Sequence, residues 1–225
     1  MSVYTRITPE AFADVVSRKL TDLLAHKPQV NLALPGGSTP KRFLESLSKA
    51  DLEWNRINVF LTDERWVDIS SEQSNEKLIR EHLLQGKARH AIFYGIYQQG
   101  LTIEQSVQAI NQKFGDTGPA FDIIILGMGD DTHIASIFPG NREIYTIDGI
   151  YAAASELHSS GLPRVSLTPG TITRAELVIL AISGENKEAA LTLAWGSGVS
   201  IINPVLLLKE RPIDELLIYS IYKNN

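Results

Sequence analysis

The chain has 225 residues, of which 44% are hydrophobic and 21% charged, and its formal net charge is −5 at pH 7. This composition is typical of a globular protein, and the acidic balance argues against nucleic acid as a partner of the whole surface. The chain contains no cysteine, which excludes disulfides, zinc thiolates and thiol nucleophiles. We find no linker or internal repeat and expect a single domain over residues 1–225.

The first residues lack the basic and apolar regions of a signal peptide. No apolar run approaches the roughly 20 residues that are needed to span a bilayer. We therefore expect a cytoplasmic protein without a membrane partner.

Helical and strand patterns alternate along the chain. Thr8 is a predicted N-cap, Pro9 occupies the first helical position, and an apolar stripe continues to about residue 25. Further helices are predicted from Pro40 onward and over residues 75–84, 103–114 and 185–195. Short apolar runs predict strands at residues 30–34, 57–61, 92–94, 121–126, 165–167, 177–182 and 216–221.

This alternation predicts an α/β fold, namely a doubly wound, mostly parallel sheet with helices on both faces. The almost wholly apolar run 121–126 is expected at the centre of the sheet, where both of its faces are covered. Ligands of such folds bind beyond the C-terminal ends of the strands. Four polar clusters at predicted strand ends therefore form the candidate site.

The first cluster joins a predicted strand to the helix that Pro40 opens. Glycines here can turn backbone N–H groups toward an anion, and the helix N-terminus adds partial positive charge. Lys41 and Arg42 lie in the first turn, where cations oppose the helix dipole, and a bound phosphate would remove that conflict. The alternative is a plain strand–turn–helix junction, and the spacing is not that of a Walker A loop. The predicted anion-binding residues are Gly36, Gly37, Ser38 and Thr39.

The second cluster is the charged triplet Asp63, Glu64 and Arg65, directly after the strand 57–61. A triplet of this kind is often only a solvated loop. At a strand end, however, Arg65 would reach the cleft and could bind phosphate or carboxylate through its fork of donors.

The third cluster follows the strand 121–126 and begins Gly127-Met128-Gly129. It resembles the start of a dinucleotide fingerprint, but Thr132 stands where the third glycine belongs. A metal site would need more ligands than this loop offers. We therefore expect neither a dinucleotide nor a metal here.

A histidine close to an aspartate is a common acid–base pair, because histidines titrate near neutral pH and a carboxylate can fix the ring tautomer. His133 and Asp131 form such a pair, although a helix-capping or structural histidine is the alternative.

The fourth cluster places Lys187 in the first turn of the helix 185–195, again against the dipole. It could bind the same anion, or it could be a surface lysine paired with Glu188. Arg164, just before the strand 165–167, is a further candidate, with a solvated arginine as the alternative.

Together these motifs resemble the 6-phosphogluconolactonase family, whose fold is shared with glucosamine-6-phosphate deaminase. They occur in the family's order between about residue 30 and residue 190. The matching stretches are Gly36-Gly37-Ser38-Thr39-Pro40, Asp63-Glu64-Arg65 with Ser74-Asn75, Gly127-Met128-Gly129 with Asp131, His133, Ala135-Ser136 and Phe138-Pro139, Arg164 with Ser166-Leu167-Thr168, and Gly184 with Lys187 and Ala190-Leu191.

The resemblance implies hydrolysis of 6-phosphoglucono-1,5-lactone, a small phosphorylated sugar lactone, without a metal or organic cofactor. It implies that His133 is the general base, that Asp131 orients it, and that Arg65 stabilises negative charge or holds the substrate. The phosphate would be held by Gly36, Gly37, Ser38, Thr39, Lys187 and Arg164. We expect a monomer or a weak homo-oligomer.

Two residues depart from the family loop, which usually reads Asp-Gly-His-Thr-Ala-Ser. Thr132 replaces the glycine and would restrict the backbone if this position needs positive φ. Ile134 resembles the deaminase branch, whose loop carries His-Ile-Ala. The segment Asp63-Glu64-Arg65-Trp66 instead favours the lactonase branch. The alternatives are therefore an amino-sugar phosphate deaminase/isomerase and a non-catalytic sugar-phosphate-binding module.

Overall fold

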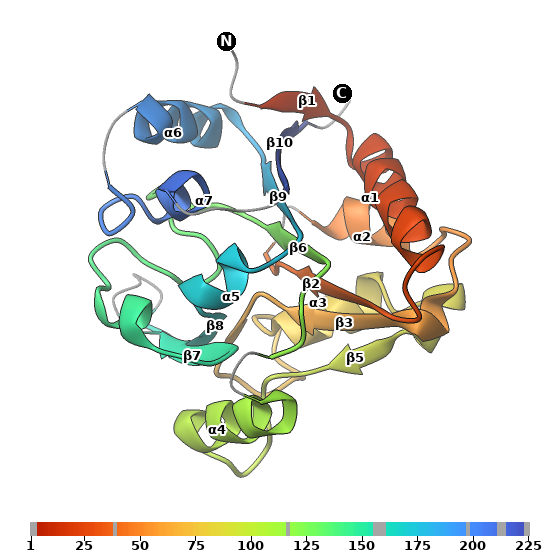
Figure 1. Cartoon of the computed structure of the whole chain (residues 1–225), viewed down its shortest axis with the longest axis horizontal. Coiled ribbons are helices and arrows are strands. Elements are labelled where there is room, and N and C mark those ends of the chain that lie inside the picture. Colours follow the sequence, from red (N-terminus) through yellow and green to blue (C-terminus); the bar gives the residue numbers. More distant parts are fainter. Residues whose placement is uncertain are drawn as a thin grey trace.

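The computed structural model describes residues 4–37, 40–115, 118–154, 161–196, 199–210 and 215–222. Its centre is a sheet of seven strands in the order β1-β10-β9-β6-β2-β3-β5, and each neighbouring pair is parallel (Figure 1). These strands are β1 (Thr5–Ile7), β2 (Val30–Leu34), β3 (Ile57–Leu61), β5 (Ile92–Tyr94), β6 (Ile123–Leu126), β9 (Leu177–Ile182) and β10 (Glu215–Ile221).

Helices cover both faces of this sheet. Figure 1 shows α1 and α2 on one side of it and α6 and α7 on the other. On the first side α1 packs on α2, which in turn packs on α3. The α-helices are α1 (Pro9–Leu24), α2 (Lys41–Leu47), α3 (Asn75–His82), α4 (Ile103–Phe114), α5 (Pro169–Thr173), α6 (Glu185–Gly196) and α7 (Leu207–Glu210), and the short 3₁₀ helices are η1 (Trp54–Arg56), η2 (Gly86–His90), η3 (Glu143–Thr146) and η4 (Pro204–Leu206).

Helix α1 illustrates how local sequence produces these elements. The side chain of Thr8 accepts a hydrogen bond from the backbone N–H of Ala11, which caps the helix at its first turn. Phe12, Val16 and Leu20 follow at helical spacing and are fully buried. The helix therefore begins where the sequence predicts and buries its apolar stripe against the sheet and α2.

The predicted α/β architecture is confirmed, and β6 is the fourth of the seven strands with all four residues buried. One predicted strand does not join this sheet. Residues 165–167 belong to β8 (Arg164–Leu167), which pairs antiparallel with β4 (Asp63–Arg65) and β7 (Tyr151–Ala154) in a separate three-stranded sheet. The charged triplet 63–65, expected as a post-strand loop, forms an edge strand of this small sheet.

The order of the strands creates a crevice. From β2 the chain passes through α2 to β3 on one side, whereas from β6 it continues to β9 on the other. The loops after β2 and β6 therefore diverge, and this switch point is where open α/β sheets bind ligands.

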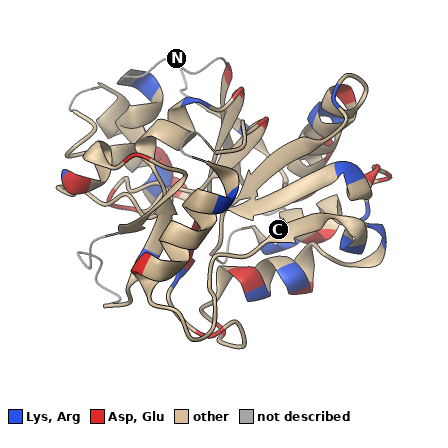
Figure 2. Ribbon diagram, turned by 60° about the horizontal axis from the view of Figure 1, so that its bottom comes forward, with Lys and Arg blue, Asp and Glu red and all other residues tan. Residues whose placement is uncertain are grey.

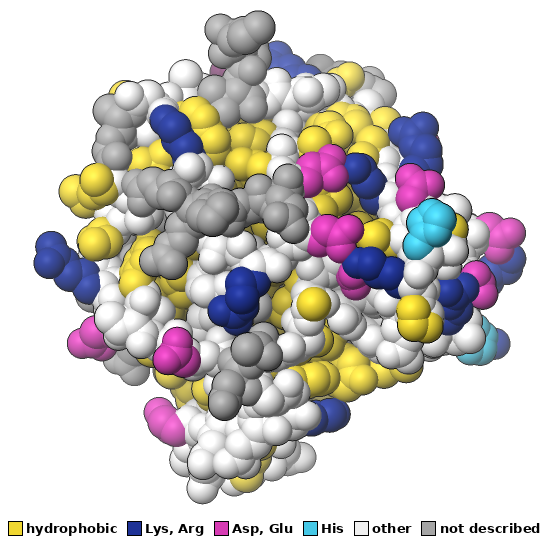
Figure 3. Space-filling model, in the orientation of Figure 1, with side chains coloured by type: hydrophobic (Ala, Val, Ile, Leu, Met, Phe, Trp, Pro, Cys, Tyr) yellow, Lys and Arg dark blue, Asp and Glu magenta, His cyan; other side chains and the backbone are white. Residues whose placement is uncertain are grey.

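The described surface carries charges of both signs. Figure 2 shows basic and acidic residues interspersed over helices and loops, and Figure 3 shows hydrophobic side chains in small groups between charged ones. Among the described residues, no helix is both long and apolar enough to cross a bilayer.

Candidate active site

A cleft of about 360 Å³ lies at the switch point between β2 and β6. Loops from four parallel strands and three residues of the small sheet line it, so the four predicted clusters converge on one place. From the predicted site residues the lining includes Gly36, Gly37, Arg65, His133, Arg164 and Lys187. Asp131 contacts His133 beside the cleft, and Ser38 and Thr39 lie outside the described residues.

The loop after β6 forms a tight hairpin over residues 128–134, which we call the site hairpin. Met128 pairs with Ile134 in an antiparallel bridge, and the N–H of Gly129 donates to the carbonyl of His133 over 2.9 Å. Three residues, 130–132, remain as the loop. Such loops commonly end on a residue in the left-handed conformation, a position that favours glycine.

Thr132 occupies that left-handed position, with φ of 69°. A β-branched residue here is strained, at a cost on the order of 1–3 kcal/mol, and persists only where surrounding contacts over-determine it. The sequence raised this possibility at Thr132, and the backbone shows that the position does need positive φ.

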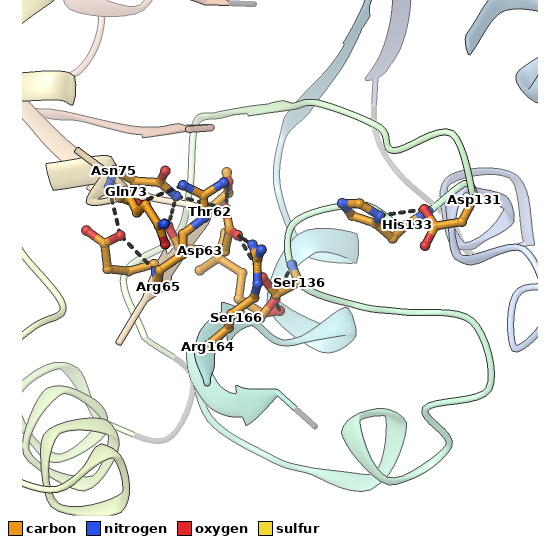
Figure 4. A network of polar contacts seen from close by, with 12 residues as sticks. Thr62, Asp63, Arg65, Gln73, Asn75, Asp131, His133, Ser136, Arg164 and Ser166 are labelled. Atoms are coloured by element: carbon orange, nitrogen blue, oxygen red, sulfur yellow. Dashed lines mark hydrogen bonds and ion pairs between the residues drawn. The ribbon is translucent and has the colours of Figure 1, made fainter. Parts of the chain in front are cut away.

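The site hairpin holds Asp131 and His133 together. Nδ1 of His133 lies 2.5 Å from Oδ1 of Asp131, and the same oxygen accepts the backbone N–H of His133 over 3.2 Å. This contact places the ring proton on Nδ1, so that the lone pair is on Nε2. Figure 4 shows the ring on the side of Asp131 that faces Arg65 and Arg164.

The electrostatic coupling of this pair favours an ionised Asp131. Burial acts to raise the pKa of Asp131, but the hydrogen bonds from His133 and the charge of its ring outweigh burial and hold that pKa below its ordinary value. A carboxylate that stays ionised can orient the imidazole and stabilise its protonated form.

Gly129 leaves the space that the imidazole occupies. A Cβ on Gly129 would lie 2.2 Å from Cε1 and Nδ1 of His133 and 2.5 Å from Oδ1 of Asp131. The packed imidazole ring leaves no room for a side chain at this position, which explains the glycine. A dinucleotide fingerprint is not needed to account for Gly129.

Glu64 fixes β4 to the start of α3. Its buried carboxylate accepts the backbone N–H groups of Arg65, Asn75 and Glu76 over 2.7–2.8 Å and the hydroxyl of Ser74 over 3.1 Å. Burial raises the pKa of Glu64, while the three N–H groups act in the opposite direction. This anchor determines where the neighbouring Arg65 enters the cleft.

The Glu64→Ala variant should lose on the order of 3 kcal/mol in free energy of unfolding, because it leaves several buried donors without an acceptor. Urea denaturation measures this loss. The control is Glu81→Ala, an exposed glutamate of α3, which should cost less than about 0.5 kcal/mol. Equal stabilities of the two variants would contradict the anchoring role.

Arg65 lies at the wall of the cleft. Its Nη1 donates to the carbonyl of Gln73 over 2.7 Å, which holds the guanidinium in place. Among the described residues, its Nε–H has no hydrogen-bond partner. A fixed arginine with an unused N–H donor can bind an anionic ligand or a carbonyl oxygen.

Arg164 is buried, contrary to the alternative of a solvated arginine. Its Nη1 lies 3.7 Å from Oδ2 of Asp63, and its guanidinium lies over the ring of Phe138, 5.7 Å from the centroid. Burial lowers the pKa of Arg164, the charge of Arg65 acts in the same direction, and Asp63 and Glu64 oppose them. Arg164 is thus a buried residue of the cleft lining.

Asp63 is a cleft residue that the sequence analysis did not assign. It is buried, and its Oδ2 accepts the hydroxyl of Ser136 over 2.7 Å (Figure 4). The backbone N–H of Ser136 in turn donates to the hydroxyl of Ser166 over 3.1 Å. This network connects β4, β8 and the segment after the site hairpin. Its signal in the sequence is a carboxylate two residues after a buried strand and two residues before the predicted ligand Arg65.

Lys187 also lines the cleft, in the first turn of α6. It does not pair with Glu188, whose carboxylate instead binds Arg6, Tyr4 and Ser220. Among the described residues Lys187 forms no ion pair, so its charge is available to a ligand.

Lys41 and Arg42 do not contribute to the cleft. Both occur in the first turn of α2, as the sequence predicts, but they are exposed and do not line the cavity. The expected phosphate therefore has to be sought at Lys187 and the glycines after β2. Among the described residues, no group of three His, Cys, Asp or Glu side chains could hold a metal ion.

Comparison with known proteins decides the family. The family model described as glucosamine-6-phosphate isomerases/6-phosphogluconolactonase matches residues 7–216. The chain belongs to this family. It is 34% identical to a 6-phosphogluconolactonase of Rhizobium meliloti, over 93% of this chain and 92% of the relative. It is 36% identical to one of Pseudomonas aeruginosa, over 80% and 77% of the two chains.

Solved structures of family members have the same fold. The crystal structure of a 6-phosphogluconolactonase from Shewanella baltica superposes with a TM-score of 0.89 and 26% identity, covering 99% of this chain and 98% of the other. A monomeric glucosamine-6-phosphate deaminase superposes with a TM-score of 0.78 at 19% identity, over 98% and 97% of the two chains, which shows the shared fold alone.

Proposed function

We propose that this protein is a 6-phosphogluconolactonase, which hydrolyses 6-phosphoglucono-1,5-lactone to 6-phosphogluconate in the oxidative pentose phosphate pathway. The observation that carries the proposal is the convergence, in one cleft, of an Asp131–His133 pair with Arg65, Arg164 and Lys187. The family relatives at 34–36% identity that are named for this reaction support it.

In the proposed mechanism His133 acts as a general base. The lone pair on Nε2 takes a proton from water while the water oxygen bonds to the lactone carbonyl carbon. The carbonyl π electrons move to the oxygen, and Arg65 stabilises the resulting negative charge. Asp131 keeps the imidazole in the required tautomer and stabilises the imidazolium that forms.

The intermediate then collapses and the ring opens. The bond between the carbonyl carbon and the ring oxygen breaks, and His133 returns its proton to that oxygen, which becomes a hydroxyl group. The carboxylic acid product loses its remaining proton to solvent. A lactone is already an activated ester, so this chemistry requires neither a covalent nucleophile nor a metal or organic cofactor.

The phosphate end of the substrate is proposed to bind Lys187 and the backbone of Gly36 and Gly37, with Ser38, Thr39 and Arg164 as further ligands. Lys187 supports this orientation because it lines the cleft without an ion-pair partner among the described residues. Binding a remote phosphate holds the lactone against the base and lowers the entropic part of the barrier.

The Lys187→Ala variant should raise KM for the lactone about 10- to 100-fold with little change in kcat, because a charged contact to the bound substrate is lost. Steady-state kinetics measures both constants. Lys87→Ala, at an exposed lysine paired with Asp51 outside the cleft, is the control and should keep both constants. An unchanged KM for Lys187→Ala would argue against the phosphate assignment.

The second candidate is amino-sugar phosphate deamination, because the family description includes both activities and Ile134 resembles the deaminase loop. A direct comparison separates them. We expect lactone hydrolysis above the spontaneous rate and no ammonia release from glucosamine 6-phosphate. Ammonia release without lactone hydrolysis would show that the protein is a deaminase and contradict the lactonase proposal.

We also propose that the protein is a single domain over residues 1–225, that it acts in the cytoplasm as a monomer or weak homo-oligomer, and that nucleic acid is not its partner. The mixed charge of the described surface supports the last point. Light scattering on the purified protein measures its mass in solution.

A further inference from the structure

Residues 199–206, which we call the strap, run from the region after α6 across the loops that follow β6. The carbonyl of Ile201 accepts the N–H of Gly140 over 2.7 Å, and the carbonyl of Ser200 accepts the hydroxyl of Tyr145 over 3.0 Å. The strap thus lies against the segment that carries the site hairpin.

The strap also contacts the site hairpin at Thr132. The N–H of Val205 donates to the carbonyl of Thr132 over 3.0 Å, and the hydroxyl of Thr132 lies 3.4 Å from Oδ1 of Asn203. Thr132 is 5% exposed, and its contact with Asn203 is partly buried. Both contacts occur at the strained position, between the two residues of the acid–base pair.

Asn203 is itself held in place. Its N–H donates to the carbonyl of Val199, and its carbonyl accepts the N–H of Leu206, both over 2.9 Å. It directly precedes η4, whose residues are buried. These contacts hold the backbone from which the side chain of Asn203 reaches Thr132.

We propose that Thr132 is a positioning residue for the reaction, which acts by binding the site hairpin to Asn203 and Val205 of the strap. The inference rests on the proposed lactonase function. In the family loop this position is usually glycine, which adopts positive φ without strain but has no side chain to hold. In this chain the threonine side chain provides a second point of attachment, and the strained backbone is kept in one conformation by it.

This attachment affects the acid–base pair, because Asp131 and His133 are the residues on either side of Thr132. The φ and ψ angles of Thr132 determine how the peptide of Asp131 is oriented relative to that of His133. The contact between Nδ1 and Oδ1 at 2.5 Å depends on that orientation. Loosening Thr132 should therefore lower kcat through the base, while the phosphate-binding residues keep KM unchanged.

The test is a set of variants at Thr132 and Asn203 in the lactone assay. Thr132→Ser keeps the hydroxyl group and should stay within about twofold of the wild-type kcat. Thr132→Val and Asn203→Ala should each lower kcat about tenfold at unchanged KM, well short of the roughly 10²-fold that a 1 Å misplacement can cost. The double variant should be no slower than either single variant, since both remove the same contact.

The split between kcat and KM distinguishes positioning from general destabilisation. In both single variants kcat should fall while KM and the melting temperature stay close to the wild-type values, because only the placement of the base changes. Ile202→Ala, at an exposed strap residue, is the control and should keep the wild-type kcat.

Wild-type kcat in Thr132→Val and Asn203→Ala, or kcat losses that multiply in the double variant, would overturn the inference. A KM that rises together with the fall in kcat would overturn it as well. Absence of lactone hydrolysis by the wild-type protein would be a failure of the proposed function instead. Melting temperatures are measured alongside, and Asn203→Ala, outside the hairpin, provides the result if Thr132→Val does not fold.

Discussion

Replacement of His133 by alanine should lower kcat for lactone hydrolysis by about 10²- to 10⁴-fold, the usual contribution of a general base. The variant removes the group that takes the proton from water and later returns it to the ring oxygen. KM should change little, because the proposed phosphate ligands remain. The measurement is the initial rate, corrected for spontaneous ring opening.

A second histidine–carboxylate pair provides the matched control. Nδ1 of His82 lies 2.9 Å from Oε1 of Glu45, outside the cleft. His82→Ala should keep wild-type kcat. A His133→Ala enzyme as fast as His82→Ala would remove the base from the mechanism.

The carboxylate of the Asp131–His133 pair should be needed for the same step. Despite burial, the hydrogen bonds and charge of His133 lower the pKa of Asp131, so its carboxylate stays ionised to more acid pH than an ordinary aspartate. Asp131→Asn should therefore lower kcat at little-changed KM, because a neutral amide does not stabilise the imidazolium that forms when His133 takes the proton from water. Steady-state kinetics measures this loss, and a wild-type kcat in Asp131→Asn would contradict the role of the carboxylate.

The Gly129→Ala variant should lose activity on a similar scale, at least about 10²-fold in kcat. The new Cβ would stand 2.2 Å from two atoms of the His133 ring, so the imidazole has to leave its position beside Asp131. Because a side chain can move more easily than backbone, the fold should survive. Lactone kinetics should therefore show a lowered kcat, while a melting curve should show that the variant is still folded.

Gly127→Ala is the control for the fold. A Cβ at Gly127 meets no atom within 4 Å, so a methyl group two residues away in the same segment should leave the melting temperature unchanged. A Gly129→Ala protein with wild-type kcat would contradict the packing of His133 against this glycine.

The long elements could be predicted because each one satisfies local rules. Residues 9–24 combine an N-cap, an initial proline and a 3.6-residue stripe, and they form α1. The central strand β6 is apolar throughout because its side chains are buried on both faces of the sheet. These signals depend only on neighbouring residues and are independent of strand order.

The small sheet could not be predicted in the same way. β4 consists of Asp63, Glu64 and Arg65, which have no apolar alternation, and it is a strand because β8 pairs with it. That pairing joins Asp63 to Ser166, about a hundred residues apart. The run 165–167 was recognised as a strand, but its partners were not visible in the sequence.

The convergence of the four clusters could be predicted because parallel strands bring their C-terminal ends to one edge. The contact of Asp63 with Ser136 could not, since only the folded chain brings the two residues together. The sequence indicates that Thr132 could restrict the backbone if its position needs positive φ. Only the structure shows that φ is positive there, and that the strap, about seventy residues further along the chain, contacts the threonine.

The most direct test of the proposed reaction is the rate at which the purified protein opens 6-phosphoglucono-1,5-lactone, followed by proton release in weak buffer. We expect a rate above spontaneous hydrolysis that increases in proportion to enzyme concentration and falls by at least about 10²-fold in His133→Ala. A wild-type rate equal to spontaneous hydrolysis would contradict the proposed reaction.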